Sequence, residues 1–98
     1  MKKLTPQEIT ERLKDHPGWK LDGSAIHKLY AFQSFPDALG FVMRLAFDAE
    51  KADHHPDFQV SYRKVTVTWS THDAGGLTAR DFAGAGQSDM IASRMEPK

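Results

Sequence analysis

Cysteine is absent from this 98-residue sequence, which excludes a disulfide framework, a thiolate nucleophile and a cysteine-bound zinc site. Net charge is absent as well, because 13 Lys and Arg residues balance 13 Asp and Glu residues. A protein that binds nucleic acid directly usually carries a basic patch, so this balance argues against direct nucleic-acid binding. The chemistry of the protein must therefore come from side chains other than thiols.

Long apolar runs are also missing. The most apolar stretch, residues 39–49, is interrupted by Arg44 and Asp48 and is too short to span a membrane. The first residues, 1–6, show no apolar segment of the kind found in secretory signals. We therefore expect a cytoplasmic protein that does not insert into a membrane.

What the sequence does contain suits a single globular domain over residues 1–98. Hydrophobic residues make up 40% and charged residues 27%, which is ordinary globular usage. A chain of this length buries only a modest core, so self-association would add stability. Five histidines without a single thiol point toward imidazole chemistry.

Capping signals and runs of alternating apolar residues divide the chain into helices and strands. Thr5 with Glu8 forms one capping box. Thr78 with Asp81 forms another, and Ser34 is a further N-cap candidate. The expected elements, in order, are a helix from 6 that ends at 16–18, strands 19–21 and 25–32, a helix 35–53, strands 58–62 and 65–69 with residues 63 and 64 in their turn, and a helix beginning after 78.

This order predicts an α+β fold, with a four-stranded antiparallel sheet, helices packed on one face, and the sequence α-β-β-α-β-β-α. The helix 35–53 has a broad apolar face, wide enough to pack on the sheet and on a second subunit. The last helix has a thin apolar face and contains Gly84 and Gly86, each of which costs about 1 kcal/mol relative to alanine.

The segment 50–57 is the densest in side chains that can carry chemistry. On a continuous helix Glu50 and His54 are four residues apart and share a face, with Asp53 beside them. Imidazoles exchange protons near neutral pH, so His54 and His55 are candidate acids and bases. His72 follows the last strand and is a third candidate.

Plainer interpretations of these residues remain open. The histidine pair could be a solvated helix end, Trp19 a core residue, and Asp81 only the carboxylate of a capping box. Three histidines can also hold zinc. Adjacent histidines tend to point apart, however, and compact zinc spacings such as His-Glu-x-x-His are absent.

The spacing Glu50-x3-His54-His55-Pro56-x5-Tyr62-x9-His72-x8-Asp81 resembles the signature of the pterin-4a-carbinolamine dehydratases, and the similarity extends over about residues 4–81. This resemblance implies removal of water from 4a-hydroxytetrahydropterin to give the quinonoid dihydropterin, which regenerates the cofactor of aromatic amino acid hydroxylases. It also implies an α+β fold, a homodimer or homotetramer, and catalysis with no metal and no organic cofactor.

The resemblance further implies roles for individual residues. His54, His55 and His72 are the implied active-site histidines, and the residues implied to surround the pterin are Glu50, Asp53, Trp19, Arg80 and Asp81. We hypothesise that His54 and His72 exchange acid and base roles, that His55 mainly binds, and that Trp19 stacks on the pterin ring. The alternative is a non-catalytic partner of a hydroxylase or a transcriptional coactivator.

Overall fold

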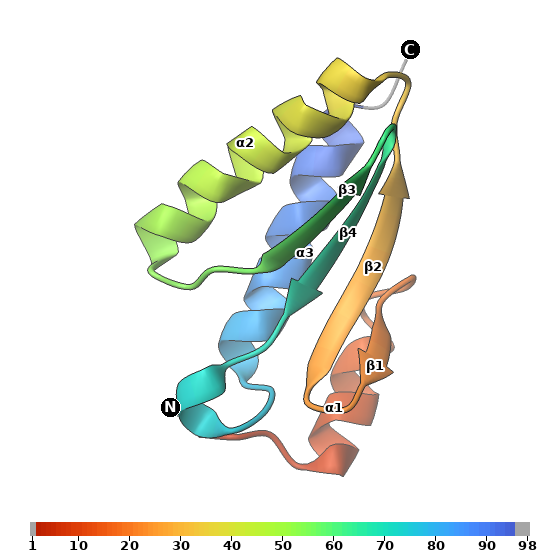
Figure 1. Cartoon of the computed structure of the whole chain (residues 1–98). Helices are drawn as coiled ribbons and strands as arrows, with labels where there is room; N and C mark the ends of the chain where they lie inside the picture. Colours follow the sequence, from red (N-terminus) through yellow and green to blue (C-terminus); the bar gives the residue numbers. More distant parts are fainter. Residues whose placement is uncertain (1, 96–98) are drawn as a thin grey trace.

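A four-stranded antiparallel sheet with helices on one face makes up the computed structural model, which describes residues 2–95 (Figure 1). The predicted α+β class and the order α-β-β-α-β-β-α are confirmed, with a short 3-10 turn added before the last helix. The elements are α1 (Pro6–Leu13), β1 (Lys20–Asp22), β2 (Ala25–Ala31), α2 (Phe35–Ala52), β3 (Asp57–Ser61), β4 (Lys64–Trp69), η1 (His72–Ala74) and α3 (Ala79–Arg94).

The sheet has the strand order β1-β2-β4-β3, so β2 and β4 form its centre. Ile26 pairs with Trp69, and Tyr30 with Val65, across these two strands. All four side chains are buried in the core between the sheet and the helices, where α2 and α3 pack against each other (Figure 1). The central strand β4 therefore leads directly from the core to the segment that bears His72.

Local hydrogen bonds explain where the helices begin. The backbone N–H of Glu8 donates to the Thr5 hydroxyl at 3.1 Å, and the Thr5 N–H donates to the Glu8 carboxylate at 2.8 Å. The second of these bonds lowers the pKa of the Glu8 carboxyl. Ser34 likewise accepts from the Asp37 N–H at 3.2 Å, so these two predicted caps are confirmed. None of the helices within residues 2–95 is long and apolar enough to cross a membrane.

The turn between β3 and β4 lies one residue earlier than predicted. Ser61 pairs with Lys64, so Tyr62 and Arg63 form the loop, and the prediction of residues 63 and 64 was wrong. Tyr62 adopts a left-handed backbone conformation with φ of 54°, which ends β3 before it. The pairing between the two strands thus overrides the alternation of apolar residues that had extended the strand to Tyr62.

Gly84 allows α3 to approach the sheet closely. A Cβ atom built on Gly84 would lie 2.5 Å from a ring carbon of Trp69, which is well inside van der Waals contact. The glycine that weakens the helix by its propensity is therefore required by packing, because the indole of Trp69 occupies the space that a side chain would fill.

Gly84→Ala is expected to lower the free energy of unfolding by about 1–3 kcal/mol, although alanine is the better helix former by about 1 kcal/mol, because the added methyl group overlaps Trp69. Urea unfolding followed by tryptophan fluorescence measures the change. Gly86→Ala is the matched control in the same helix, since its Cβ would lie 3.7 Å from His16, an ordinary contact. Equal effects of the two substitutions would contradict this role for Gly84.

Candidate active site

The end of α2 directs the two adjacent histidines to different partners. The helix stops at Ala52, and Asp53 adopts the left-handed conformation with φ of 54° and ψ of 41°. His54 Nε2 then lies 2.7 Å from Asp81 Oδ1, while His55 Nε2 lies 2.8 Å from Glu50 Oε1. The expectation that the two histidines point apart is confirmed.

The predicted pairing of Glu50 with His54 on one helical face was wrong. A shared face requires the helix to continue through residue 54, and the left-handed residue Asp53 ends it before that point. The glutamate is instead paired with His55, and both of these side chains are exposed.

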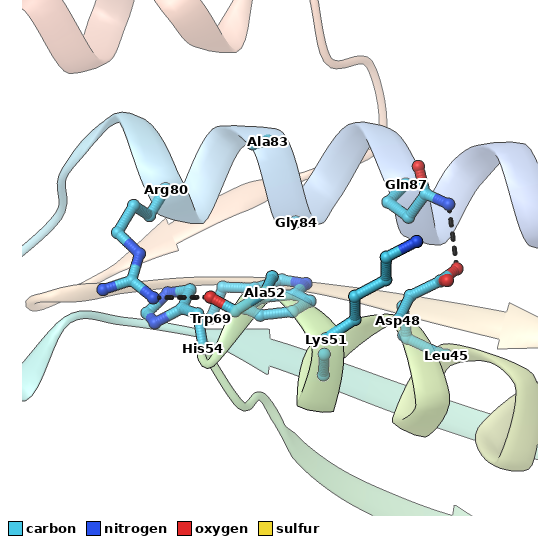
Figure 2. A pocket seen from close by; sticks show the side chains of 11 residues that line it. Leu45, Asp48, Lys51, Ala52, His54, Trp69, Arg80, Ala83, Gly84 and Gln87 are labelled. Atoms are coloured by element: carbon cyan, nitrogen blue, oxygen red, sulfur yellow. Dashed lines mark hydrogen bonds between the residues drawn. The ribbon is translucent and has the colours of Figure 1, made fainter.

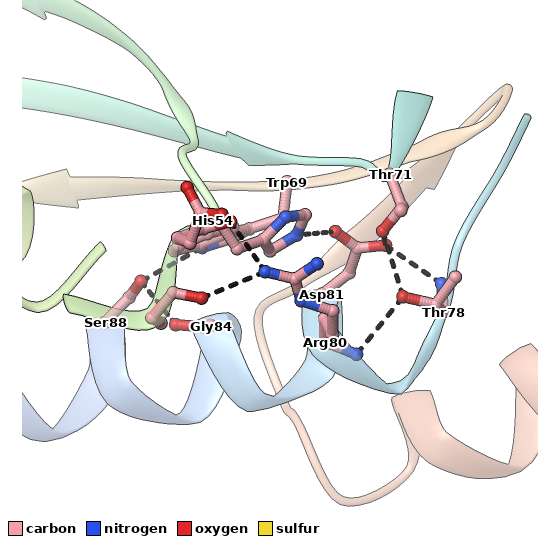
Figure 3. Close-up of polar contacts among 10 residues, drawn as sticks. His54, Trp69, Thr71, Thr78, Arg80, Asp81, Gly84 and Ser88 are labelled. Atoms are coloured by element: carbon pink, nitrogen blue, oxygen red, sulfur yellow. Dashed lines mark hydrogen bonds and ion pairs between the residues drawn. The ribbon is translucent and has the colours of Figure 1, made fainter. Parts of the chain in front are cut away.

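Asp81 is the buried anchor of the site. Its side chain is 0% exposed, and His54, which it contacts, is 11% exposed. Its second oxygen, Oδ2, accepts from the Thr71 hydroxyl at 2.7 Å and from the Thr78 backbone N–H at 2.9 Å (Figure 3). One oxygen thus completes the cap of α3 and the other holds His54, so the capping interpretation and the site interpretation of Asp81 both apply.

The ring of His54 is also held across its face. It stacks on Trp69 with ring centroids 5.3 Å apart and planes 26° apart. The indole N–H of Trp69 donates to the Ser88 hydroxyl at 3.2 Å, and Ser88 donates to the Gly84 carbonyl at 2.7 Å. Contacts on its face and at Nε2 therefore restrict the imidazole to one orientation.

Arg80 ties the end of α2 to the beginning of α3. Its guanidinium donates to the carbonyl of Ala52 at 2.9 Å (Figure 2) and to the carbonyl of Asp53 at 2.6 Å. Ala52 is the last residue of the helix and Asp53 is its C-cap, so neither carbonyl has a partner within the helix. The arginine therefore satisfies the helix end from which His54 emerges.

A pocket of about 340 Å³ lies between the C-terminal half of α2 and the N-terminal half of α3. The side chain of Lys51 extends from α2 toward α3, and Gln87 donates to Asp48 at 2.8 Å (Figure 2). The residues that line the pocket are Leu45, Asp48, Ala49, Lys51, Ala52, His54, Trp69, Arg80, Ala83, Gly84 and Gln87. Of the predicted site residues, His54 and Arg80 border this pocket.

Trp19 lies away from His54, in a separate set of hydrogen bonds around Asp89. Its side chain is 5% exposed, and its indole N–H donates to Asp89 at 3.1 Å. Tyr30 and Lys28 donate to the same carboxylate, and burial together with this neighbouring carboxylate raises the pKa of Tyr30 far above its ordinary value. The indole beside His54 is that of Trp69.

The remaining predicted residues lie at the periphery. His72 is exposed and belongs to η1, immediately after Thr71 of the buried network. The Asp53 side chain is exposed, and this residue contributes its carbonyl to Arg80. Within residues 2–95, no group of three or more His, Asp or Glu side chains is arranged to hold a metal ion.

Trp69, Thr71 and Gly84 were not among the predicted site residues. Trp69 ends a strand of alternating apolar residues, which marks it as a core residue and says nothing of a histidine neighbour. A glycine inside a helical segment can indicate the close approach of another group, and that signal at Gly84 is the one that could have revealed the indole.

Comparison with known proteins gives a consistent result. A family model described as Pterin 4 alpha carbinolamine dehydratase matches residues 2–91. A protein of Roseiflexus castenholzii is 52% identical over 88 residues, covering 90% of this chain and 95% of the relative. A protein of Picosynechococcus sp. is 46% identical over 89 residues, covering 91% and 97%. Both relatives are assigned by name to the same dehydratases.

Solved structures share the fold. A crystal structure described as a transcriptional coactivator/pterin dehydratase from Brucella melitensis matches with a TM-score of 0.88 and 39% identity, covering 92% of this chain and 98% of that one. A pterin dehydratase-like protein described as a RuBisCO assembly factor in the alpha-carboxysome matches with a TM-score of 0.62 and 23% identity, covering 76% and 86%. The second likeness concerns the fold alone.

Proposed function

The chain belongs to the pterin-4a-carbinolamine dehydratase family, and on that premise we propose that it removes water from a 4a-hydroxytetrahydropterin to give the quinonoid dihydropterin. The observation that carries this proposal is the placement of His54 just beyond the end of α2, where a buried carboxylate and an indole hold its ring in one orientation. A pre-oriented imidazole is the group that general acid–base catalysis of a dehydration needs.

The reaction requires two proton transfers. The C4a–O bond breaks, and the hydroxyl leaves as water after it receives a proton. The N5 lone pair forms the C4a=N5 double bond, and a base receives the N5 proton, so that the electrons of the broken N5–H bond remain on N5 as its lone pair. Because the N5 lone pair drives the departure of the hydroxyl, one acid and one base of near-neutral strength are sufficient.

We assign these two roles to His54 and His72. His54 is held on α2's end by Asp81, and His72 is exposed in η1, one residue after a member of the same network. The face of the pterin that carries the hydroxyl would decide which imidazole acts as acid and which as base. In this proposal His55 mainly contributes to binding.

The exposed carboxylates complete the proposed binding site. Glu50 and Asp53 are exposed beside the histidines, and carboxylates accept hydrogen bonds from the amino group and ring N–H of a pterin's pyrimidine edge. Arg80 holds the backbone that positions them. Trp19 is buried beside Asp89, so we assign it to packing rather than to stacking on the ligand.

His54→Ala and His72→Ala should each lower the rate of dehydration of 4a-hydroxytetrahydropterin, above the uncatalysed background, by about 10²–10⁴-fold, the usual contribution of a general acid or base. An absorbance assay of quinonoid dihydropterin formation measures the rate. His27→Ala is the matched control, because His27 lies on β2 and is not one of the proposed site residues. Wild-type rates for both His54→Ala and His72→Ala would overturn the assignment.

We also propose that the protein self-associates through α2. Leu39, Met43 and Phe47 follow one another at four-residue steps and are exposed, with Phe47 at 70%. Such a stripe is suited to pairing with the same stripe of a second copy, because the contact buries apolar side chains on both. A core as small as this one would gain stability from that burial.

Met43→Glu should shift the protein toward the monomer, since it places a charge in the centre of the proposed contact. Sedimentation velocity over a range of protein concentrations measures the distribution. Arg44→Glu provides a control with an exposed acidic residue at the next position of the helix. A monomeric wild-type protein, or an unchanged oligomer in Met43→Glu, would exclude this interface.

A further inference from the structure

We propose that Thr78 and Thr71 form a one-way hydrogen-bond chain onto Asp81 that keeps His54 protonated on Nε2 and leaves Nδ1 as its working nitrogen. The tautomer is a property of the folded chain alone. Only the use of Nδ1 in proton transfer rests on the proposed dehydratase function.

The direction of the chain follows from counting protons. The Thr71 hydroxyl lies 2.7 Å from Asp81 Oδ2, and an ionised carboxylate can only accept, so Thr71 donates there. A hydroxyl has one proton, so the 2.9 Å contact between the hydroxyls of Thr71 and Thr78 must be donated by Thr78. Thr78 in turn accepts from the Arg80 backbone N–H at 3.2 Å, which completes a chain with a single polarity.

The surroundings of Asp81 suit a carboxylate that accepts hydrogen bonds. It lies in the first turn of α3, where the helix dipole stabilises negative charge. Its Oδ2 receives two donors, the Thr71 hydroxyl and the Thr78 backbone N–H. The second donor is a backbone group and cannot reverse, so Oδ2 is locked as an acceptor.

The remaining oxygen then determines the tautomer of His54. Oδ1 lies 2.7 Å from Nε2 and can only accept, so Nε2 must carry a proton whether the ring is neutral or charged. Nδ1 makes no hydrogen bond within residues 2–95, and no buried side-chain nitrogen or oxygen in that range lacks a partner. Nδ1 is therefore not fully buried, and because His54 borders the pocket between α2 and α3, we infer that a ligand can reach this nitrogen.

In the proposed dehydration, Nδ1 of His54 takes the proton from pterin N5 as the C4a=N5 bond forms. With the roles reversed, Nδ1–H gives its proton to the departing hydroxyl. The proton on Nε2 stays on the Asp81 side in both cases, so the carboxylate stabilises the imidazolium without itself being protonated.

Thr71 is a positioning residue in this scheme, and it serves two histidines. Its hydroxyl supports the carboxylate behind His54, while its carbonyl accepts from the Ala74 N–H at 3.1 Å and so anchors η1, which carries His72. Its side chain is buried. Thr71 therefore contacts both the carboxylate that holds His54 and the turn that carries His72.

The direct test is long-range ¹H–¹⁵N correlation spectroscopy of the full chain labelled on histidine nitrogen. Wild-type His54 should show the proton on Nε2. Asp81→Asn should invert this tautomer: the amide oxygen must face the fixed Thr78 N–H, so the amide NH₂ faces His54 and requires a lone pair on Nε2. Activity of this variant should fall by about 10²-fold or more. A neutral wild-type ring that carries its proton on Nδ1 and not on Nε2 overturns the proposal even if no variant folds.

Thr71 is tested by a pair of substitutions. Thr71→Val removes the hydroxyl and should lower kcat about tenfold with a smaller change in KM, as expected for misplacement of an acid–base group. Thr71→Ser retains the hydroxyl and should restore wild-type kcat. Equal kcat values for valine and serine would overturn the positioning role. Failure of the dehydratase proposal is separate, because it would appear as an inactive wild-type protein with the Nε2–H tautomer intact.

Discussion

The buried carboxylate of Asp81 is the interaction on which the site depends. It joins the first turn of α3, the segment that follows β4, and His54 just beyond the end of α2, which are three separate parts of the chain. A buried charge without partners is strongly destabilising, and here each oxygen has at least one donor. The arrangement that satisfies the charge is the same one that orients His54, so stability and site geometry share one network.

Close packing of α3 against β4 makes this network possible. Gly84 brings the helix onto the indole of Trp69, and the indole then supports the ring of His54. The Ser88 hydroxyl accepts a hydrogen bond from the indole N–H and donates one to the Gly84 carbonyl. Two polar residues of α3, Asp81 and Ser88, are therefore buried with hydrogen-bond partners.

Local signals predicted the elements well because they act within a few residues. The bonds of Thr5 with Glu8 and of Thr78 with Asp81 require only neighbouring backbone, so the caps could be read from the sequence. The prediction that Glu50 and His54 share a helical face was wrong, because it required the helix to continue through residue 54. The left-handed conformation of Asp53, held in place by Arg80 from a distant helix, ended it earlier.

The sequence by itself determined the α+β class, the order of the elements and the set of histidines, because periodicity, capping and motif spacing are local properties. Only the tertiary structure decided which partner each histidine has, that Trp69 rather than Trp19 lies beside His54, and that Asp81 is buried behind the ring. These facts depend on contacts between residues far apart in the chain, and such contacts are set by packing.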